Sequence, residues 1–444
     1  MPKTELNRAR GLILVVIDGL TPSMLEDTLE RGTAPALALL AEHGGYRRAV
    51  STFPSLTPVC LSSLATGAHP DVHEIPHLVW YHRGERRLVE YGSSFGAVRA
   101  AGTRQSLIDT VYGLNASHLG RDAVTVYEAL EDEGLTAGAV NITCYRGRTE
   151  HRPTVPFLTR PARGPSRFFF YNLFQSDVTG APLSVRNRPR GTIDAYAAAV
   201  GRWLVTRDGF DFLVFYLSDY DYASHAQGPD AAHAALARCD EAVGGLIEAA
   251  GGADQFLERY AVILCSDHGQ TQVGQVVRLQ DSFPDAIVTA SNRAGMVYSD
   301  RDADELAARL DGNPAIDVVL YREGEEAVAR RDGEELRFTP DGTSGDVTIL
   351  DHPQGLERAW AAVANPNAGE LIVSAAAGWE FADLAGRHHA GGGSHGSLLA
   401  GDSEVPMLAV GLETLPGSIV EVMPAVLEHF GVGLPAYARA PARG

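Results

Sequence analysis

Short runs of apolar, largely β-branched residues, each ending in a polar turn, constrain the fold of this chain most strongly. The first, LILVVI (12–17), ends at Asp18-Gly19 and is typical of a strand buried on both faces. The pattern recurs at three later places, residues 212–219, 260–269 and 406–411. Amphipathic helical stretches lie between them, for example residues 123–134 and 230–250. Strands alternating with helices predict an α/β fold, a central sheet with helices on both faces.

Two segments depart from this alternation. Residues 290–375 have the pattern helix, strand, loop, strand, helix, strand, which predicts a small α+β insertion. Residues 145–190 are rich in Arg, Pro and Gly, and they predict a long irregular excursion that is a candidate lid. Its aromatic run RFFFYNLF is more typical of local core than of a substrate wall. We therefore expect one catalytic α/β domain, residues 1–289 and 376–444, interrupted by the insertion.

Charge and composition exclude some partners. The 444 residues include 37 Lys and Arg against 56 Asp and Glu, a net charge of −19, with 45% hydrophobic residues. This balance is typical of a globular protein and argues against a nucleic acid or an anionic membrane as the main partner. An anionic small molecule stays compatible, because a bound metal ion can invert the local field.

The cysteines and the first residues of the sequence bear on the cellular compartment of the protein. Four widely spaced cysteines form no CxxC pair and are expected to be reduced thiols, mostly buried. Only six uninterrupted apolar residues precede Asp18, too few for a signal peptide core or a membrane span. We expect a cytoplasmic protein.

Carboxylates and histidines gather at or near the ends of the predicted core strands. Taken singly, each has an ordinary explanation as a cap, a turn or a surface histidine. Together they would repel one another on one rim of the sheet unless cations lay between them. Mixed Asp and His ligands without cysteine suit zinc, with manganese as the second choice, and six ligands are enough for two adjacent ions. The residues are Asp18, Asp221, His225, Asp267, His268 and His395.

The order of these elements resembles the alkaline phosphatase superfamily. That order is an apolar strand ending in Asp, a hydroxyl nucleophile about 40 residues later, DxxxH, DH, and a late GxHG-like histidine. Over residues 11–275 and 388–411 the chain is similar to the type I phosphodiesterase/nucleotide pyrophosphatase branch. The resemblance implies an alkaline-phosphatase-like fold and two metal ions. One ion would take Asp221, His225 and His395, and the other Asp18, Asp267, His268 and the nucleophile oxygen.

The stretch VSTFPSLTPVC (50–60) offers four hydroxyls and a thiol as nucleophiles. The family places its nucleophile nine residues before a Thr-Gly pair. Thr57 lies nine residues before Thr66, whereas Thr52 lies fourteen before it. Thr57 also precedes Pro58 at a predicted helix start, where free N–H groups and the helix dipole favour a phosphoryl group. An ordinary N-cap role is the alternative. Cys60 is a weaker candidate, since it lies a turn inside the helix and the CxPxR sequence of sulfatases is absent.

One departure from the family pattern concerns the phosphate oxygens. Cys60 stands where the family usually has an Asn that helps hold a non-bridging phosphate oxygen. Asn141 and Thr143, which follow another strand-like run, are candidates for the missing hydrogen bond. Cys60, Asn141 and Thr143 are therefore the expected substrate contacts.

We expect a metal-dependent hydrolase of phosphodiester or pyrophosphate bonds that acts through a phosphothreonine on a small molecule, a nucleotide among the candidates. The uncharged run PVCLSSLA after Thr57 favours diesters over monoesters, although Arg146 or Arg148 could reach in from the excursion. The alternatives are a phosphonoacetate-type C–P hydrolase, a phosphomonoesterase and, outside hydrolases, a phosphomutase. A catalytically inactive binding protein is disfavoured, because all six ligand positions are intact.

Overall fold

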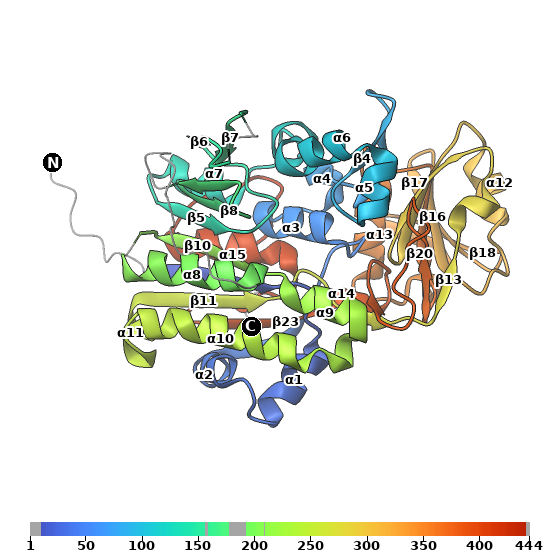
Figure 1. Cartoon of the computed structure of the whole chain (residues 1–444). Helices are drawn as coiled ribbons and strands as arrows, with labels where there is room; N and C mark the ends of the chain where they lie inside the picture. Colours follow the sequence, from blue (N-terminus) through green and yellow to red (C-terminus); the bar gives the residue numbers. More distant parts are fainter. Residues whose placement is uncertain (1–9, 156–158, 177–191, 208, 441–444) are drawn as a thin grey trace.

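A computed structural model of the chain describes residues 10–155, 159–176, 192–207 and 209–440 (Figure 1). Within these residues, an eight-stranded sheet in the order β2-β23-β11-β1-β10-β5-β8-β9 forms the centre of the molecule. Its strands are β1 (Gly11–Ile17), β2 (Gly45–Val50), β5 (Ala137–Val140), β8 (Arg167–Phe170), β9 (Phe174–Ser176), β10 (Phe212–Leu217), β11 (Tyr260–Cys265) and β23 (Glu404–Val410).

The inner strands of this sheet run parallel. β1 pairs in parallel with both β10 and β11, and β5 and β8 continue the parallel set beyond β10. Antiparallel pairs complete the two sides: β23 with β11 and β2 with β23 on one side, and β9 with β8 on the other. Parallel neighbours place their carboxyl ends at one edge, the usual location of a site in such sheets.

Helices cover both faces of the sheet, and the side chains of β1 show why. Alternate residues of this strand point to opposite faces. Leu12, Leu14 and Val16 lie in one apolar core, and Ile13, Val15 and Ile17 lie in the other. The expected α/β fold is confirmed. The first core contains residues of α3 (Thr57–Thr66), α7 (Val126–Asp132) and α15 (Val422–Phe430). The second contains residues of α1 (Pro22–Glu30), α2 (Pro35–His43), α8 (Ile193–Thr206), α10 (His233–Ala249) and α11 (Ala253–Arg259).

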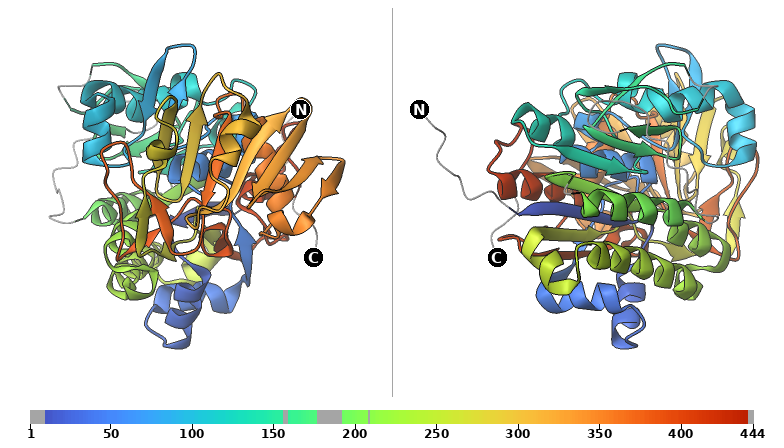
Figure 2. Two further views of the ribbon diagram at one scale, coloured as in Figure 1. Left: turned by 90° about the vertical axis from the view of Figure 1, so that its right-hand side faces the viewer. Right: turned by 60° about the vertical axis from the view of Figure 1, so that its left-hand side comes forward.

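A second sheet lies beside the first, on the right in Figure 1 and toward the viewer in the left view of Figure 2. In the described residues it has seven antiparallel strands in the order β14-β15-β20-β16-β17-β18-β19. That residues 290–375 form a unit separate from the catalytic domain stays a prediction. The strands are β14 (Ile287–Ser291), β15 (Ala294–Tyr298), β16 (Ile316–Glu323), β17 (Glu326–Arg331), β18 (Glu334–Thr339), β19 (Gly342–Gly345) and β20 (Leu371–Ala375), with helices α12 (Ala303–Ala308) and α13 (Gly355–Ala364).

The segment 145–190 is more regular than its composition suggests. It contains the short hairpin β6 (Thr149–His151) and β7 (Ala162–Gly164), followed by β8 and β9 of the central sheet. Phe168 and Phe170 lie in one core and Phe169 in the other, so the aromatic run is buried on both faces of the sheet. Residues 156–158 and 177–191 of this segment lie outside the described residues, and its role as a lid stays a prediction.

The remaining elements connect these layers. No helix among the described residues has the length and apolar character needed to cross a membrane. All four cysteines are free and buried. The connecting elements are α4 (Pro70–His73), β3 (Val79–His82), β4 (Arg87–Glu90), α5 (Phe95–Ala101), α6 (Thr103–Ile108), the π-helical η1 (Asp109–His118), α9 (Asp219–Gln227), η2 (Pro229–Ala231), β12 (Thr271–Gln272), β13 (Gln275–Val277), η3 (Leu279–Ser282), η4 (Val347–Leu350), β21 (Trp379–Phe381), β22 (Gly393–Ser394), α14 (Ala400–Ser403) and η5 (Ile419–Glu421).

Candidate active site

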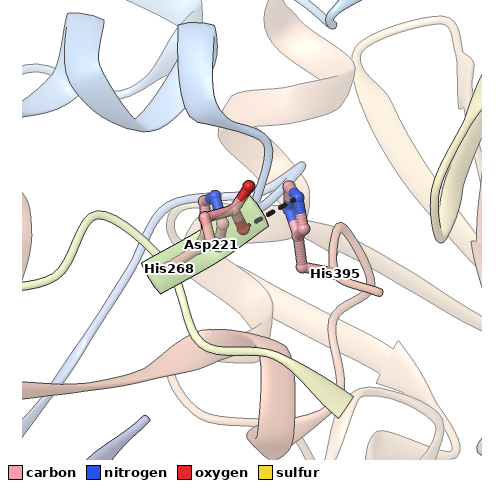
Figure 3. Close-up of side chains that lie close together, drawn as sticks. All are labelled: Asp221, His268 and His395. Carbon is pink, nitrogen blue, oxygen red and sulfur yellow. Dashed lines mark ion pairs between the residues drawn. The ribbon is translucent and has the colours of Figure 1, made fainter. Parts of the chain in front are cut away.

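Three adjacent parallel strands deliver the carboxylates and histidines to one edge of the sheet. Asp18 follows β1 directly, and Asp267 and His268 follow β11. Asp221 lies in α9, which begins two residues after β10. His395 follows β22 in the glycine-rich loop. Figure 3 shows the side chains of Asp221, His268 and His395 pointing toward one another.

His268 Nε2 lies at the centre of a group of oxygen atoms. It is 3.1 Å from Thr57 Oγ1, 3.3 Å from Asp18 Oδ1 and 3.5 Å from Asp267 Oδ2. Neither of those two carboxylate oxygens makes a hydrogen bond, although both are buried. Buried polar atoms without partners are rare and costly, so these oxygens are suited to bind a cation.

Asp221 and His395 form the adjoining group. One ligand atom from each of Asp221, His268 and His395 lies within 4.8 Å of the others. His225 Nε2 lies 3.3 Å from Asp221 Oδ2, and its ring packs 5.2 Å from that of His395, centroid to centroid. The structure therefore brings all six predicted ligands to one place, with His268 between the two groups.

All three histidines are oriented by backbone carbonyl groups. Nδ1 of His225 bonds the Gly393 carbonyl at 2.8 Å, that of His268 the Gly269 carbonyl at 3.0 Å, and that of His395 the Ser55 carbonyl at 2.7 Å. A carbonyl oxygen only accepts, so Nδ1 carries the proton in each ring and Nε2 presents a lone pair to the site. This is the usual arrangement of histidines that bind metal ions.

The electrostatics of the cluster also call for a cation. Burial, together with Asp267 and Asp221, raises the pKa of Asp18 well above its ordinary value. Burial likewise raises the pKa of Asp267, although His268 opposes it. Burial would raise the pKa of Asp221 too, but His225, His395 and His268 outweigh it and lower that pKa. Carboxylates this close can all ionise only if positive charge lies between them. The side chains therefore fit divalent metal ions, whose chemistry suits Asp and His ligands.

Thr57 is placed by the start of α3. The helix begins at Thr57 itself and Leu56 is the N-cap residue, so the expectation that Thr57 is the cap is off by one residue. Its hydroxyl makes no capping bond and instead contacts His268. Gly67 ends the helix as expected, with φ of 63°, a conformation that glycine adopts without strain.

The rival nucleophiles of this stretch, the Thr52 hydroxyl and the Cys60 thiol, have other partners. Thr52 Oγ1 lies 3.0 Å from His69 Nδ1, and Thr52 is buried. Cys60 is fully buried with its Sγ 3.3 Å from Ser51 Oγ, and burial raises the pKa of its thiol well above the ordinary value. A thiol in such surroundings is inert.

Two of the three expected substrate contacts have other partners in this structure. Asn141 gives its side-chain amide to the Ile193 carbonyl and accepts from the Tyr171 amide at 3.1 Å, so both ends bond the backbone. Cys60 lies inside the core, as described above. Thr143 Oγ1 is buried and makes no hydrogen bond, and the Thr143 carbonyl accepts from Asn115. Their role as substrate contacts stays untested, and the surroundings of Asn141 and Cys60 favour structural roles.

Arg146 and Arg148 form ion pairs with acidic residues of α7. Arg146 pairs with Glu128 at 3.2 Å and donates to the carbonyl groups of Leu119 and Gly120. Arg148 pairs with Glu128 at 2.9 Å and Asp132 at 2.7 Å. The expectation that either arginine reaches the site is not met in this structure, because α7 supplies acidic partners for both.

Three polar residues that contact the site were not predicted from the sequence. Tyr216 donates its hydroxyl to Asp18 Oδ2, and Gln270 donates its amide to Asp221 Oδ1. Asn292, from the turn between β14 and β15, donates Nδ2 to His395 Nε2 at 2.8 Å. Two of these residues could have been found from the sequence: Tyr216 carries a hydroxyl within an apolar strand, and Gln270 lies two residues after the Asp267-His268 pair. The sequence around Asn292 carried none.

Glycine lets the backbone approach the carboxylates. A side chain at Gly19, where φ is 68°, would place its Cβ 2.8 Å from Asp221 Oδ1. At Gly396, where φ is 120°, a Cβ would lie 3.2 Å from the amide nitrogen atoms of Arg293 and Ala294. The His395 loop and the β14–β15 turn therefore pack directly on each other.

A family model matches most of this chain. The model of type I phosphodiesterase/nucleotide pyrophosphatase matches residues 12–398. The chain belongs to the type I phosphodiesterase/nucleotide pyrophosphatase family. Members of this family are metal-dependent hydrolases of phosphoester bonds. The recognition made from the sequence is therefore confirmed.

Solved structures of other proteins share the fold of this chain. Murine ectonucleotide pyrophosphatase/phosphodiesterase 5 is 14% identical, with a TM-score of 0.64 and 98% of each chain covered. A threonine-to-alanine variant of that murine protein, described as inactive, was solved in complex with AMP. Phosphonoacetate hydrolase from Sinorhizobium meliloti 1021, in complex with phosphonoformate, is 18% identical, with a TM-score of 0.63 and 96% of each chain covered. A sequence search of curated proteins found no match.

Proposed function

We propose that this family member hydrolyses phosphodiester or pyrophosphate bonds of a small molecule through a phosphothreonine at Thr57. The observation that carries the proposal is the position of the Thr57 hydroxyl, 3.1 Å from the Nε2 atom of His268 that also faces Asp18 and Asp267. The threonine-to-alanine variant of the similar murine protein, described as inactive, supports the same role.

Two divalent ions would be held by the side chains of the cluster. Asp18, Thr57, Asp267 and His268 would hold one, and Asp221, His225 and His395 the other, with zinc as the best fit and manganese as the second choice. When bound, such ions would lower the pKa of the hydroxyl and offset the negative charge of the phosphoryl group.

The side chains of this protein would then carry out two displacements. The Thr57 hydroxyl gives its proton to water as its oxygen attacks phosphorus, forming one P–O bond while the bond to the leaving group breaks on the opposite side and the leaving group takes up a proton from water. Water next attacks the same phosphorus from the side that the leaving group vacated and loses a proton, the P–O bond to Thr57 breaks, and the Thr57 oxygen takes up a proton as the product leaves. His268, held by the Gly269 carbonyl, orients the Thr57 hydroxyl for the attack, and Tyr216 holds the neighbouring Asp18.

Diesters or pyrophosphates are the expected substrates, a nucleotide derivative among them. A monoester has one more negative oxygen that calls for a cationic partner, and Arg146 and Arg148 are paired with α7. The side chains of α3 that follow Thr57 are uncharged. We also propose a cytoplasmic location, supported by the four free, buried thiols.

A phosphonoacetate-type C–P hydrolase is the second candidate, and one cavity favours it. A cavity of about 220 Å³ next to the cluster is lined by Asn292, Arg387, His388 and His389, together with Phe95, Phe381 and Asp383. Its size and the Arg387 side chain suit a small substrate with a second anionic group, such as the carboxylate of phosphonoacetate.

A substrate panel with a matched variant separates the candidates. Protein stripped of metal and reconstituted with zinc or manganese would be assayed on bis-nitrophenyl phosphate, nitrophenyl phosphate, a dinucleotide and phosphonoacetate. We expect the highest kcat/KM on the diester or dinucleotide, with little change in Arg387→Gln. A preference for phosphonoacetate that is lost in Arg387→Gln would instead establish the second candidate. A monoester preference would contradict both.

A further inference from the structure

The two arginines that do not reach the active site line a separate cavity. Arg146 and Arg148 belong to the wall of a hollow of about 370 Å³, which residues of η1, α7 and the β6–β7 hairpin complete. This volume is typical of sites for small molecules. The hairpin and α7 lie on the left of Figure 1, whereas the second sheet lies on the right. None of the described residues that line this cavity belongs to the metal cluster, so it is a distinct place in the fold.

Positive charge is concentrated in this cavity, although the chain as a whole is acidic. Among the described residues that line it, four arginines stand against two glutamates, whereas the full chain has 37 Lys and Arg against 56 Asp and Glu. The arginines are Arg146, Arg148, Arg160 and Arg163, and the glutamates are Glu128 and Glu150. A concave wall with an excess of one charge raises the local concentration of counter-ions. The cavity is therefore suited to an anionic ligand.

Two of the four arginines are neutralised by α7. Arg146 and Arg148 both pair with the buried carboxylate of Glu128, at 3.2 Å and 2.9 Å. Arg148 also pairs with Asp132 at 2.7 Å. These contacts fix both guanidinium groups in the wall of the cavity.

The other two arginines have no carboxylate partner. Within the described residues, neither Arg160 nor Arg163 forms an ion pair, although Glu150 is the cross-strand neighbour of Arg163. The guanidinium carbon of Arg160 lies 5.1 Å from the centroid of the Tyr112 ring, and the Tyr112 hydroxyl donates to the Arg160 carbonyl at 2.7 Å. An aromatic ring orients a guanidinium group without removing its charge. Two uncompensated like charges on one cavity repel each other, and an anion between them would turn this cost into attraction.

Backbone contacts hold the walls of the cavity in place. Asn115 Oδ1, from η1, accepts from the amides of Tyr145 at 2.6 Å and Arg146 at 2.9 Å. Its Nδ2 atom donates to the Thr143 carbonyl at 2.8 Å. On the other side, the Thr125 hydroxyl donates to the Arg146 carbonyl at 2.6 Å. A ligand would therefore have little chain to order when it binds, which favours affinity.

A phosphate group fits this arrangement best. The planar fork of an arginine donates to two phosphate oxygens at once, and a phosphate dianion can engage two arginines. The enclosed volume suits a small molecule, and the net charge of −19 disfavours a nucleic acid or an anionic membrane surface.

We propose that this cavity is a second binding site, for a small phosphorylated molecule whose phosphate group bridges Arg160 and Arg163. Arg146 and Arg148 add positive charge to its wall, and Arg160 and Arg163 make the direct contacts. The site uses no metal ion and is independent of the proposed reaction at Thr57.

Calorimetry on zinc-reconstituted protein tests this site. Inorganic phosphate, AMP and adenosine are each titrated at low and at high salt. The proteins compared are wild type, Arg160→Gln, Arg163→Gln, the double variant and Arg104→Gln. Arg104 is a matched control, because it is exposed on the neighbouring helix α6 and forms no ion pair with the described residues. Zinc content and the thermal midpoint confirm that each variant is folded.

Wild-type protein should bind phosphate and AMP at one more site than the double variant. Each single variant should weaken that site at least about tenfold, the scale of one lost charge-assisted contact. The affinity should fall as salt rises, and adenosine should not bind there. Arg104→Gln should behave as wild type. Equal affinities for phosphate and AMP would identify free phosphate as a sufficient ligand, and tighter binding of AMP would identify a nucleotide-like ester.

Three outcomes would overturn the inference. An equal number of phosphate sites in wild type and the double variant would place all binding at the active site. An equal loss in Arg104→Gln would reduce the effect to the overall charge of the protein. Adenosine that binds as tightly as AMP would show that the cavity does not select phosphate. If the wild-type protein hydrolyses no ester but the double variant still loses a phosphate site, the second site stands and the proposed reaction fails.

Discussion

Removal of the Asp402 carboxylate should destabilise the protein far more than removal of an exposed carboxylate. Asp402 and Arg293 are both fully buried, and Arg293 Nη1 donates to Asp402 Oδ1 at 2.7 Å. Asp402 also accepts from the Ser397 amide at 2.9 Å, the Ser397 hydroxyl at 2.6 Å and Thr271. The Asp402→Asn substitution leaves the guanidinium buried without a counter-charge, which costs about 3–5 kcal/mol in comparable pairs.

The same pair joins the β14–β15 turn to the His395 loop, so the effect should reach the active site. Urea unfolding in excess chelator, followed by circular dichroism, would give the free energies for Asp402→Asn, Arg293→Met and the double variant. The free energy of unfolding should fall much less in the double variant than the sum of the two single losses, because the double variant leaves neither member of the pair as an unpaired charge.

The exposed pair Arg301–Asp285, with an N–O distance of 3.2 Å, provides the control. Asp285→Asn should change the free energy of unfolding by no more than about 0.5 kcal/mol. The reasoning is refuted if Asp402→Asn costs no more than this control, or if the two single losses at Arg293 and Asp402 simply add.

Three further predictions concern the metal ions, the nucleophile and pH. Exhaustive chelation should abolish turnover and lower the thermal midpoint, because the buried carboxylates then repel one another; full activity in protein shown to be metal-free would contradict this. Thr57→Ala should lower kcat/KM by roughly 10³-fold or more with its metal content unchanged, whereas Thr52→Ala and Cys60→Ala should cost far less; a dead Thr52 variant beside an active Thr57 variant would refute the assignment. Burial and the neighbouring Asp219 raise the pKa of Asp194 from 3.8 to about 6. The native state therefore binds this proton more tightly than the unfolded state, and this group's contribution is greatest below pH 4. About 3 kcal/mol should be lost as pH rises through 6, and Asp194→Asn should remove that dependence in urea unfolding at pH 4 and 7.5.

The sequence predicted the parts of the site that depend on strand ends. Asp18 and Asp267 follow strands whose apolar runs are unmistakable, and parallel strands bring their carboxyl ends to one edge. His395 could be named because glycines surround it late in the chain. Thr57 was found by its spacing from Thr66, although the helix begins one residue earlier than expected.

The other parts of the fold and of the site depend on tertiary packing, which the periodicity of the sequence does not encode. The segment around Arg167–Phe170 joins the sheet because its phenylalanine side chains fill both cores, which outweighs the Arg, Pro and Gly content nearby. Asn292 reaches the site through contacts between segments far apart in the chain. The Arg293 amide donates to the His395 carbonyl, and the Arg293 side chain pairs with Asp402, 109 residues away. Arg146 and Arg148 turn to acidic residues of α7 instead of the site, since those partners lie closer.

The stereochemical course at phosphorus tests the central claim most directly, that hydrolysis passes through a covalent bond to Thr57. A phosphorothioate diester that is chiral at phosphorus would be hydrolysed by the zinc-reconstituted protein in water of a heavy oxygen isotope. Each in-line displacement inverts the configuration, so two displacements restore it. We predict a product with overall retention. Overall inversion would mean that water attacks the substrate directly, and Thr57 would then have no role as the nucleophile.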